Sequence, residues 1–155
     1  MKKIPIVIAV LFVLMAFTTT ALAVNPATQH GQATGGGSII SRCDLTKLAK
    51  FSFTAADTKG VIKGNVEYKD PPCNIVLKGD VTGFLCTPSN EVELTGPATV
   101  NGQSGYMYVF LIENNGAPGK NDFVSMEIFN SSGASVYDNE GFLLNGNLKV
   151  VCPTS

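Results

Sequence analysis

The sequence predicts an all-β fold, a single antiparallel β-barrel of eight or nine strands, with a β-sandwich as the alternative. Turn-forming residues recur about every ten positions, and the segments between them alternate apolar and polar side chains. This alternation is the pattern of half-buried strands, whereas helical spacing is found only in segment 1–23. A barrel is favoured because closure removes exposed strand edges. Two disulfides are expected to stabilise the domain.

Nine segments carry the strand pattern, in the order 36–41, 49–55, 61–70, 74–86, 91–100, 105–113, 122–129, 135–144 and 147–151. Alternation is clearest in 61–70 and 91–100, each of which has one apolar and one polar face. Segment 105–113 is apolar on both faces, so we expect it to be central in the sheet or covered on both sides. Asn145-Gly146 suits a type I′ hairpin turn between the last two strands.

Segment 1–23 predicts a secretory signal peptide. Lys2 and Lys3 precede an apolar run over 4–17, and Ala21-Leu22-Ala23 supplies the small-x-small cleavage pattern. The apolar run of about 14 residues is shorter than the roughly 18–20 that a transmembrane helix needs. We therefore expect a secreted or extracellular protein, or a periplasmic one if the source is Gram-negative. No stable membrane span is expected after cleavage.

Cleavage after Ala23 would leave the mature chain 24–155, whose length suits one domain with its own core. We expect a flexible lead-in over 24–37, which lacks periodicity, and the β domain over 38–155. Loss of Lys2 and Lys3 leaves 9 basic residues against 12 acidic ones, a net charge of −3. The basic residues form no cluster in the sequence, which argues against nucleic acid and anionic membranes as partners.

The mature chain contains four cysteines, Cys43, Cys73, Cys86 and Cys152. An even number of cysteines in an exported domain predicts that they form disulfides, here two. A turn at Gly79-Asp80 would place Cys73 opposite Cys86. The first and last cysteines would then form the other bond. If 74–86 is instead one continuous strand, Cys73 and Cys86 lie roughly 40 Å apart, too far for a disulfide. The pairing therefore stays open.

Seven short motifs follow one another along the mature chain: TGGGSI (34–39), FSF (51–53), GNVEYKD (64–70), VTGF (81–84), TVNGQSGY (99–106), ENNGAPGKND (113–122) and GNLKV (146–150). In this order they resemble the post-choice-of-anchor (post-COAP) β domain of bacterial and archaeal exported proteins. The resemblance implies a secreted, mostly antiparallel β module that accompanies surface or adhesion proteins and has no established catalysis. The family's usual Asp-Asn-Gly-Glu-Pro-Gly core reads Asn-Asn-Gly-Ala-Pro-Gly over 114–119, so two typical acids are missing.

The segment 113–122 has two interpretations. A calcium site would use Glu113, Asn115 and Asp122 with main-chain carbonyls, because Ca²⁺ takes about six to eight oxygen ligands. Lys120, however, places a positive charge among these ligands, and the Gly, Pro and Asn residues are those of a tight turn. We therefore expect the tip of a β-hairpin. Ca²⁺ is the less favoured alternative, and no other cofactor is predicted.

Five aromatic residues recur at alternate positions of two predicted strands: Tyr106, Tyr108 and Phe110 on one, Phe51 and Phe53 on the other. Such rows could line a cavity for a small apolar ligand inside a barrel, a common use of that architecture. They are also what an ordinary β core requires, and this second interpretation is favoured.

No catalytic group of residues is visible in the sequence. Nucleophilic catalysis needs a base beside its nucleophile, and the single histidine, His30, falls in the predicted lead-in. Glu91 and Glu93 share a strand face about 7 Å apart, within loose reach of a glycosidase pair. That face also carries threonines, so we expect surface carboxylates.

The sequence therefore predicts a secreted, non-enzymatic β module that acts in binding or as a cell-surface or extracellular structural element. Its expected partner is an extracellular protein, a glycan or a small apolar ligand. A small-molecule-binding barrel with an aromatic-lined lumen is the alternative. A weak cation-dependent adhesion module or an enzyme is the third possibility.

Overall fold

The computed structural model describes residues 31–87, 90–116, 119 and 121–152. The predicted signal peptide and residues 24–30 of the predicted lead-in lie outside this part of the chain. Within it the elements are β1 (Gly31–Ile40), β2 (Leu48–Thr58), β3 (Val61–Asp70), the short 3-10 helix η2 (Pro71–Cys73), β4 (Ile75–Asp80), β5 (Gly83–Thr87), β6 (Glu91–Val100), β7 (Gln103–Glu113), β8 (Phe123–Phe129), β9 (Ser135–Phe142) and β10 (Asn145–Val151).

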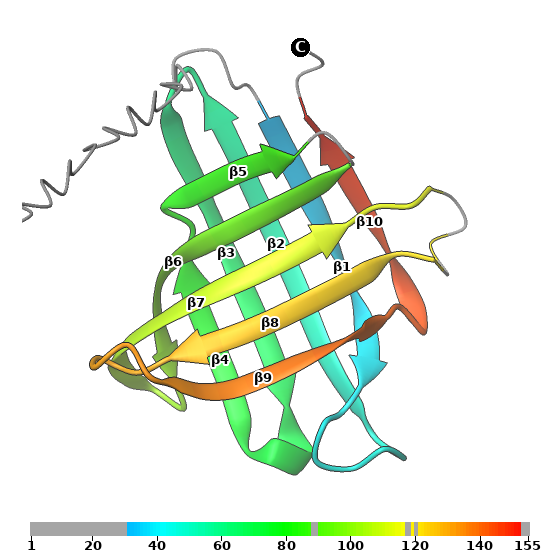
Figure 1. Cartoon of the computed structure of the whole chain (residues 1–155), viewed down its shortest axis with the longest axis vertical. Helices are drawn as coiled ribbons and strands as arrows, with labels where there is room; N and C mark the ends of the chain where they lie inside the picture. The colour runs from blue at the N-terminus through cyan, green and yellow to red at the C-terminus, as the bar shows by residue number, and fades with distance from the viewer. Residues whose placement is uncertain (1–30, 88–89, 117–118, 120, 153–155) are drawn as a thin grey trace, which may run out of the picture.

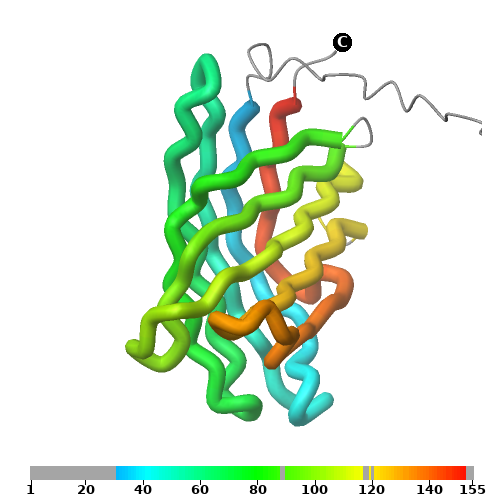
Figure 2. The backbone as a smooth tube through the Cα atoms, turned by 60° about the vertical axis from the view of Figure 1, so that its left-hand side comes forward, coloured from blue at the N-terminus to red at the C-terminus, as the bar shows by residue number. Residues whose placement is uncertain are grey.

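All ten strands belong to one antiparallel sheet with the order β10-β1-β2-β3-β4-β6-β7-β8-β9, and β5 pairs with β6. The sheet curls into a half-barrel. Strands β10 and β1–β4 form a rear layer, and β5–β9 cross in front of it (Figures 1 and 2). The predicted antiparallel all-β fold is confirmed, with ten strands in place of eight or nine. In the described residues β9 and β10 are the two ends of the strand order, so the sheet is open there.

The sheet folds over at β6. Residues 98–100 of this strand pair with β4 in the rear layer, whereas residues 91–95 pair with β5 in the front layer. Gly96 lies between these two sets, and a Cβ atom there would collide with the backbone carbonyl oxygen of Asp80. Glycine is therefore required for the close approach of the two backbones. A register shift between Ala98 and Val100 adds to the bend.

The prediction of a flexible lead-in is wrong for residues 31–37, which form most of β1. This strand lies between β10 and β2 and pairs with both. A Cβ atom at Gly37 would collide with the carbonyl oxygen of Asn145, and one at Gly35 would lie 2.6 Å from that of Asn147. The glycine-rich composition suggests flexibility in the sequence, but in the fold it permits three backbones to pack closely.

Segment 74–86, predicted as one strand, forms two. β4 ends at Asp80 and pairs with β3 and β6, whereas β5 begins at Gly83 and pairs with β6. The alternative considered for this segment, a reversing turn at Gly79-Asp80, is also absent, because the chain passes from one layer to the other here.

Two disulfides stabilise the fold, as predicted, but their pairing differs from the one considered. Cys43 bonds to Cys73, with Cα atoms 5.3 Å apart, and Cys86 bonds to Cys152, with Cα atoms 5.7 Å apart. The first bond joins the β1–β2 loop to η2, and the second joins β5 to the end of β10. The second bond therefore ties the front layer to the rear one. A pairing of Cys73 with Cys86 is excluded because the two residues belong to different layers.

The predicted hairpin at Asn145-Gly146 is also wrong, because β10 pairs with β1 and β9 pairs with β8. Gly146 is needed for another reason. Its φ angle is 117°, and a Cβ atom there would collide with the carbonyl oxygen of Gly36 on β1. The glycine thus allows β10 to begin directly against its neighbour.

The core fills the space between the two layers. Its largest fully buried side chains come from both: Ile39, Val66, Tyr68 and Leu77 from the rear layer, and Val92, Leu94, Tyr108, Phe110, Ile112, Val124, Met126 and Ile128 from the front layer. β7 lies between β6 and β8, the central position predicted for it. The described part of the chain holds no helix with the length and hydropathy of a membrane span.

Candidate functional site

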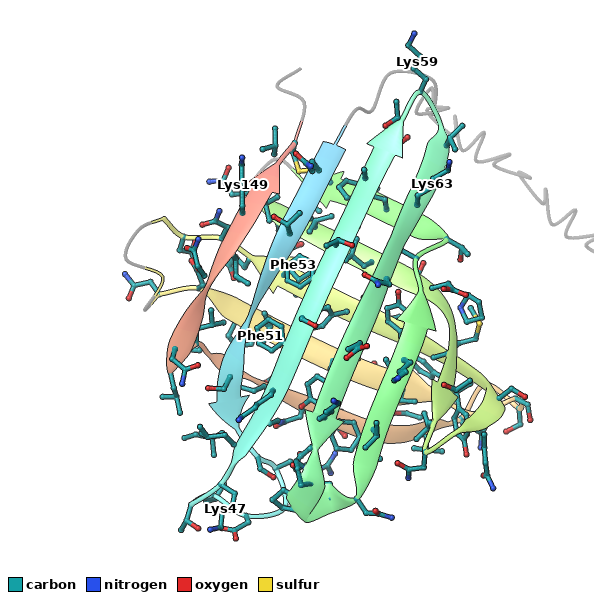
Figure 3. All side chains as sticks on the ribbon, turned by 180° about the vertical axis from the view of Figure 1, so that it is seen from behind. Lys47, Phe51, Phe53, Lys59, Lys63 and Lys149 are labelled. Atoms are coloured by element: carbon teal, nitrogen blue, oxygen red, sulfur yellow. A yellow bond between two sulfur atoms is a disulfide. The ribbon has the colours of Figure 1, made fainter. Side chains whose placement is uncertain are left out.

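The five aromatic residues considered as a ligand lining lie mainly in the core. The Phe110 ring contacts those of Phe51 and Phe53, with centroids 5.4 Å and 5.7 Å apart, and the latter two are 6.3 Å from each other. Figure 3 shows Phe51 and Phe53 along β2. Tyr108 is also buried, and Tyr106 is half-buried at the margin. The three phenylalanine rings fill the space between the layers, so a ligand could enter here only if they moved.

Tyr108 stabilises the point where the sheet folds over. Its hydroxyl donates a hydrogen bond to the backbone carbonyl oxygen of Asp80 at 3.1 Å, and its ring lies against Gly79. Burial raises the pKa of the Tyr108 hydroxyl above its ordinary value of about 10. By this hydrogen bond the Tyr108 hydroxyl gives the Asp80 carbonyl, at the end of β4, a donor.

A network of buried polar side chains connects β3, β9 and the end of β1. Asp70, which is 0% exposed, accepts hydrogen bonds from the Ser41 hydroxyl at 2.6 Å and the Tyr137 hydroxyl at 2.7 Å. The hydroxyl oxygens of Tyr68 and Tyr137 are 2.9 Å apart. Asn139 donates through Nδ2 to the Tyr68 oxygen, also at 2.9 Å. These five side chains are called the Asp70 network below.

The direction of each hydrogen bond follows from the available donors. Tyr137 directs its proton to Asp70, so its oxygen accepts from Tyr68. Tyr68 in turn accepts from Asn139, and each tyrosine hydroxyl therefore donates once and accepts once. Burial raises the pKa of both tyrosines, and for Tyr137 the bonds to Tyr68 and Asp70 raise it further. The chain of bonds ends on the carboxylate, both of whose oxygens are satisfied.

The strand pattern contains a signal for this network, although the sequence analysis missed it. Asp70 lies on the same face of segment 61–70 as the apolar residues Val66 and Tyr68. Asn139 lies on the same face of its strand as Tyr137. A polar side chain in the apolar phase of a strand is buried and needs hydrogen-bond partners. The geometry of the network is that of a satisfied structural core.

The loop after β7 is the tip of a hairpin, as predicted, because β7 and β8 pair directly. Asp122 is 1% exposed and accepts the backbone N–H of Asn115 through Oδ1 at 2.8 Å. The Asn115 side chain donates to Glu113 at 3.1 Å. Gly116 and Gly119 have φ angles of 95° and 80°, in the region that favours glycine. Lys120 lies outside the described residues.

The residues considered as calcium ligands are therefore linked by hydrogen bonds within the hairpin tip. The second carboxylate oxygen of Asp122 is buried and has no hydrogen-bond partner among the residues that the structure describes. Within the described ranges, no three His, Cys, Asp or Glu side chains gather closely enough to hold a metal ion. This geometry favours the turn over the cation site.

The surface of the described residues is hollowed in at least two places. One, of about 470 Å³, lies where β3 and β4 meet β6 and β7, and its lining includes Glu67, Lys78 and Asp80. The other, of about 570 Å³, lies beside the Cys43–Cys73 bond. None of the five aromatic residues lines either hollow.

The outer surface of the rear layer gathers lysines from four strands. It carries Lys50 on β2, Lys63 and Lys69 on β3, Lys78 on β4 and Lys149 on β10, all exposed. Figure 3 shows Lys63 and Lys149 on this side, with Lys47 and Lys59 at the two ends of β2. The strand register places Glu67 and Asp80 among these lysines, Glu67 directly opposite Lys78. We call this surface the basic face.

The outer surface of the front layer carries carboxylates instead. These are Glu91 and Glu93 on β6, Glu113 on β7, Glu127 on β8, and Asp138 and Glu140 on β9. Strands β5–β9 contain no Lys or Arg. Arg42, from the β1–β2 loop, forms an exposed ion pair with Asp138. We call this surface the acidic face. Glu91 and Glu93, which we expected to be surface carboxylates, both lie on it.

Several like charges on these faces are direct cross-strand neighbours. Lys50 is opposite Lys69 on the basic face. On the acidic face Glu91 is opposite Glu113, and Glu127 is opposite Asp138. Such pairs destabilise a sheet. Lysines that are scattered along the chain are therefore brought together into a basic cluster by the pairing of β2, β3 and β4.

A linear signal for the two faces exists, although the sequence analysis missed it. Between Lys78 and Lys149 the only basic residue is Lys120. Such a charge asymmetry between parts of a chain becomes a surface property when the parts fold into separate layers.

The chain matches no family model, no curated protein and no solved structure.

Proposed function

We propose that this chain is an exported, non-enzymatic β module that acts in binding, or as a structural element at the cell surface or outside the cell, through the outer surfaces of its sheet. The observation that carries the proposal is the separation of charge onto the basic face and the acidic face. Each face holds direct like-charge pairs that lower the stability of the isolated domain. Features that act against stability are expected at functional surfaces.

Two further observations support this proposal. Two disulfides are typical of a domain that folds in an oxidising compartment. The buried Asp70 and Tyr137 have hydrogen-bond partners within the protein, so they are not poised for chemistry. The alternative function, a small-molecule site inside the half-barrel, requires displacement of the Phe51, Phe53 and Phe110 rings. No observation favours it over the outer faces.

Chemical cross-linking in the producing culture tests this proposal. A membrane-impermeant, amine-reactive cross-linker is added to intact cells, the protein is purified, and linked peptides are identified by mass spectrometry. We expect links from lysines of the basic face to another macromolecule or to another copy of the chain. The proposal is contradicted if the protein is modified only after lysis, which excludes export, or if it is modified outside the cell without forming any intermolecular link.

A further inference from the structure

We propose that the partner of the outer faces is a second copy of this chain, with the acidic face of one copy bound to the basic face of the next. This inference rests on the proposed function and names the partner. The two faces lie on opposite sides of the molecule, since they are the outer surfaces of the two layers of one folded sheet (Figures 1 and 3). Contact between them is therefore head-to-tail, and the resulting pair of copies still offers one free basic face and one free acidic face.

Charge complementarity supports a second copy as the partner. The basic face offers five lysines beside Glu67 and Asp80, and the acidic face offers six carboxylates, one of which is paired with Arg42. A foreign polyanion would neutralise the basic face alone and would leave the like-charge pairs Glu91–Glu113 and Glu127–Asp138 unrelieved. A second copy relieves the repulsion on both faces.

Apolar side chains on the acidic face fit lysine as a partner residue. Met107 is 48% exposed, Val136 51% and Phe142 62%, and the Phe142 ring packs edge-on against Phe123 with centroids 5.4 Å apart. Lysine covers apolar surface with its methylene stem while its ammonium group reaches a nearby charge. Facing lysines can therefore cover these side chains and reach the neighbouring carboxylates.

The association should depend strongly on ionic strength, because charges that are exposed before contact are screened within about 8 Å at physiological salt. Sedimentation velocity of the mature wild-type protein is the direct measurement. At low salt we expect the average mass to rise with protein concentration beyond that of a dimer. At roughly 0.5 M salt we expect the monomer. A wild-type protein that stays monomeric at low salt and high concentration overturns the inference.

Two double variants test the faces separately. Lys50→Glu/Lys69→Glu reverses part of the basic face, and it exchanges one like-charge cross-strand pair for another. Glu127→Lys/Glu140→Lys reverses part of the acidic face. We expect each variant alone to associate at least about 100-fold more weakly than the wild type, because like charges across an interface cost several kcal/mol. Circular dichroism and melting temperature establish that each variant is folded.

Mixing the two variants provides the decisive result. The first variant keeps an intact acidic face, and the second keeps an intact basic face. An equimolar mixture should therefore regain association that neither variant shows alone. If both variants are folded and the mixture stays monomeric, the head-to-tail contact is wrong.

A matched control separates the faces from net charge. Lys47→Glu/Lys59→Glu makes the same change in net charge at the two ends of β2, at lysines other than the five that define the basic face. We expect it to associate nearly as the wild type does, and an equal loss of association would overturn the inference.

Dextran sulfate serves as a probe for a polyanion partner. If it binds the wild type but not Lys50→Glu/Lys69→Glu, and the wild type never self-associates, the partner is a polyanion. That outcome rejects the inference and leaves the proposed function intact.

Discussion

Two buried aspartates illustrate how differently this fold treats a carboxylate. Asp70 is 0% exposed, and both of its oxygens accept hydrogen bonds, from Ser41 and Tyr137. Asp122 is 1% exposed, but in the described part of the chain only one of its carboxylate oxygens has a hydrogen-bond partner, the backbone N–H of Asn115. Burial is nearly equal, so the difference lies in hydrogen bonding. An unpaired buried oxygen costs free energy that a paired one does not.

The two surroundings also differ in how many segments they join. The Asp70 network connects β3 to β9 and to the end of β1, segments far apart in the sequence. Asp122 connects residues of one hairpin tip, apart from the Leu143 N–H that its backbone carbonyl accepts. We therefore infer that Asp70 stabilises the packing of the two layers, whereas Asp122 shapes a local turn.

The largest effect is expected for Asp70→Asn. The new amide cannot accept from both Ser41 and Tyr137. If Tyr137 turned its proton toward Tyr68 instead, Tyr68 would accept twice and have no acceptor for its own proton. We expect a loss of about 2–3 kcal/mol in the free energy of unfolding, measured with urea. A loss below about 0.5 kcal/mol, within the range of ordinary surface substitutions, would mean that the network contributes little.

The next prediction concerns alkaline pH. The folded-state pKa values of Tyr68 and Tyr137 are raised above the unfolded value of about 10, chiefly by burial. Their contribution to stability is therefore fully present below pH 10 and is lost as the pH rises toward the folded-state values. We expect the urea midpoint to fall continuously from about pH 10 upward.

A double variant provides the control for this pH dependence. Tyr68→Phe/Tyr137→Phe removes both buried hydroxyls, so the protein should be less stable at neutral pH. Its stability should then decline less steeply above about pH 10 than that of the wild type. Parallel declines in the two proteins would show that these tyrosines do not cause the alkaline loss.

The same contrast shows what the sequence could predict. Alternation predicts the strands and their inward faces, because it depends on residues two positions apart. The same alternation also predicts that Asp70 is buried, because this polar residue lies on the apolar face of its strand. The turn at 113–122 is also predictable from local sequence, because Gly and Asn favour the backbone conformations of tight turns whatever their distant neighbours are.

Features that depend on distant partners could not be predicted. The break between β4 and β5 depends on Gly96 meeting the carbonyl of Asp80 across the fold. The disulfide pairing depends on that break, and the strand character of 31–37 depends on pairing with β10. Tyr137, the partner of Asp70 in β9, is also far from it along the chain. The charge asymmetry along the chain is visible in the sequence, but it becomes two charged faces only once the layers have formed.

A smaller effect is expected at Gly116, in the hairpin tip. Its φ angle is 95°, and a Cβ atom would meet no atom of the described residues within 4 Å. Gly116→Val therefore tests backbone strain without steric collision, and we expect a loss of about 1–2 kcal/mol because a β-branched residue resists positive φ. Gly116→Asn is the matched control, since Asn tolerates this conformation. Equal losses in both variants would show that strain is not the cause.

The smallest effect is expected for Asp122→Asn. The retained oxygen can still accept the Asn115 N–H, and the replaced oxygen has no hydrogen-bond partner to lose among the described residues. We expect the free energy of unfolding to change by less than about 0.5 kcal/mol, against the much larger loss for Asp70→Asn. A loss comparable to that of Asp70→Asn would remove the distinction between the two carboxylates.

Calcium provides a further test of Asp122, because a bound cation would give its second oxygen a partner and make it resemble Asp70. A ligand that binds only the folded state stabilises it by about 2.7 kcal/mol at one hundred times its dissociation constant. A calcium site in the loop would therefore raise the melting temperature of the wild type by several degrees relative to protein in EDTA, and Asp122→Asn would abolish the rise. For a turn held by its own hydrogen bonds, calcium should change neither protein. A calcium-dependent rise that disappears in Asp122→Asn would instead show that the unpaired oxygen of Asp122 is a cation ligand.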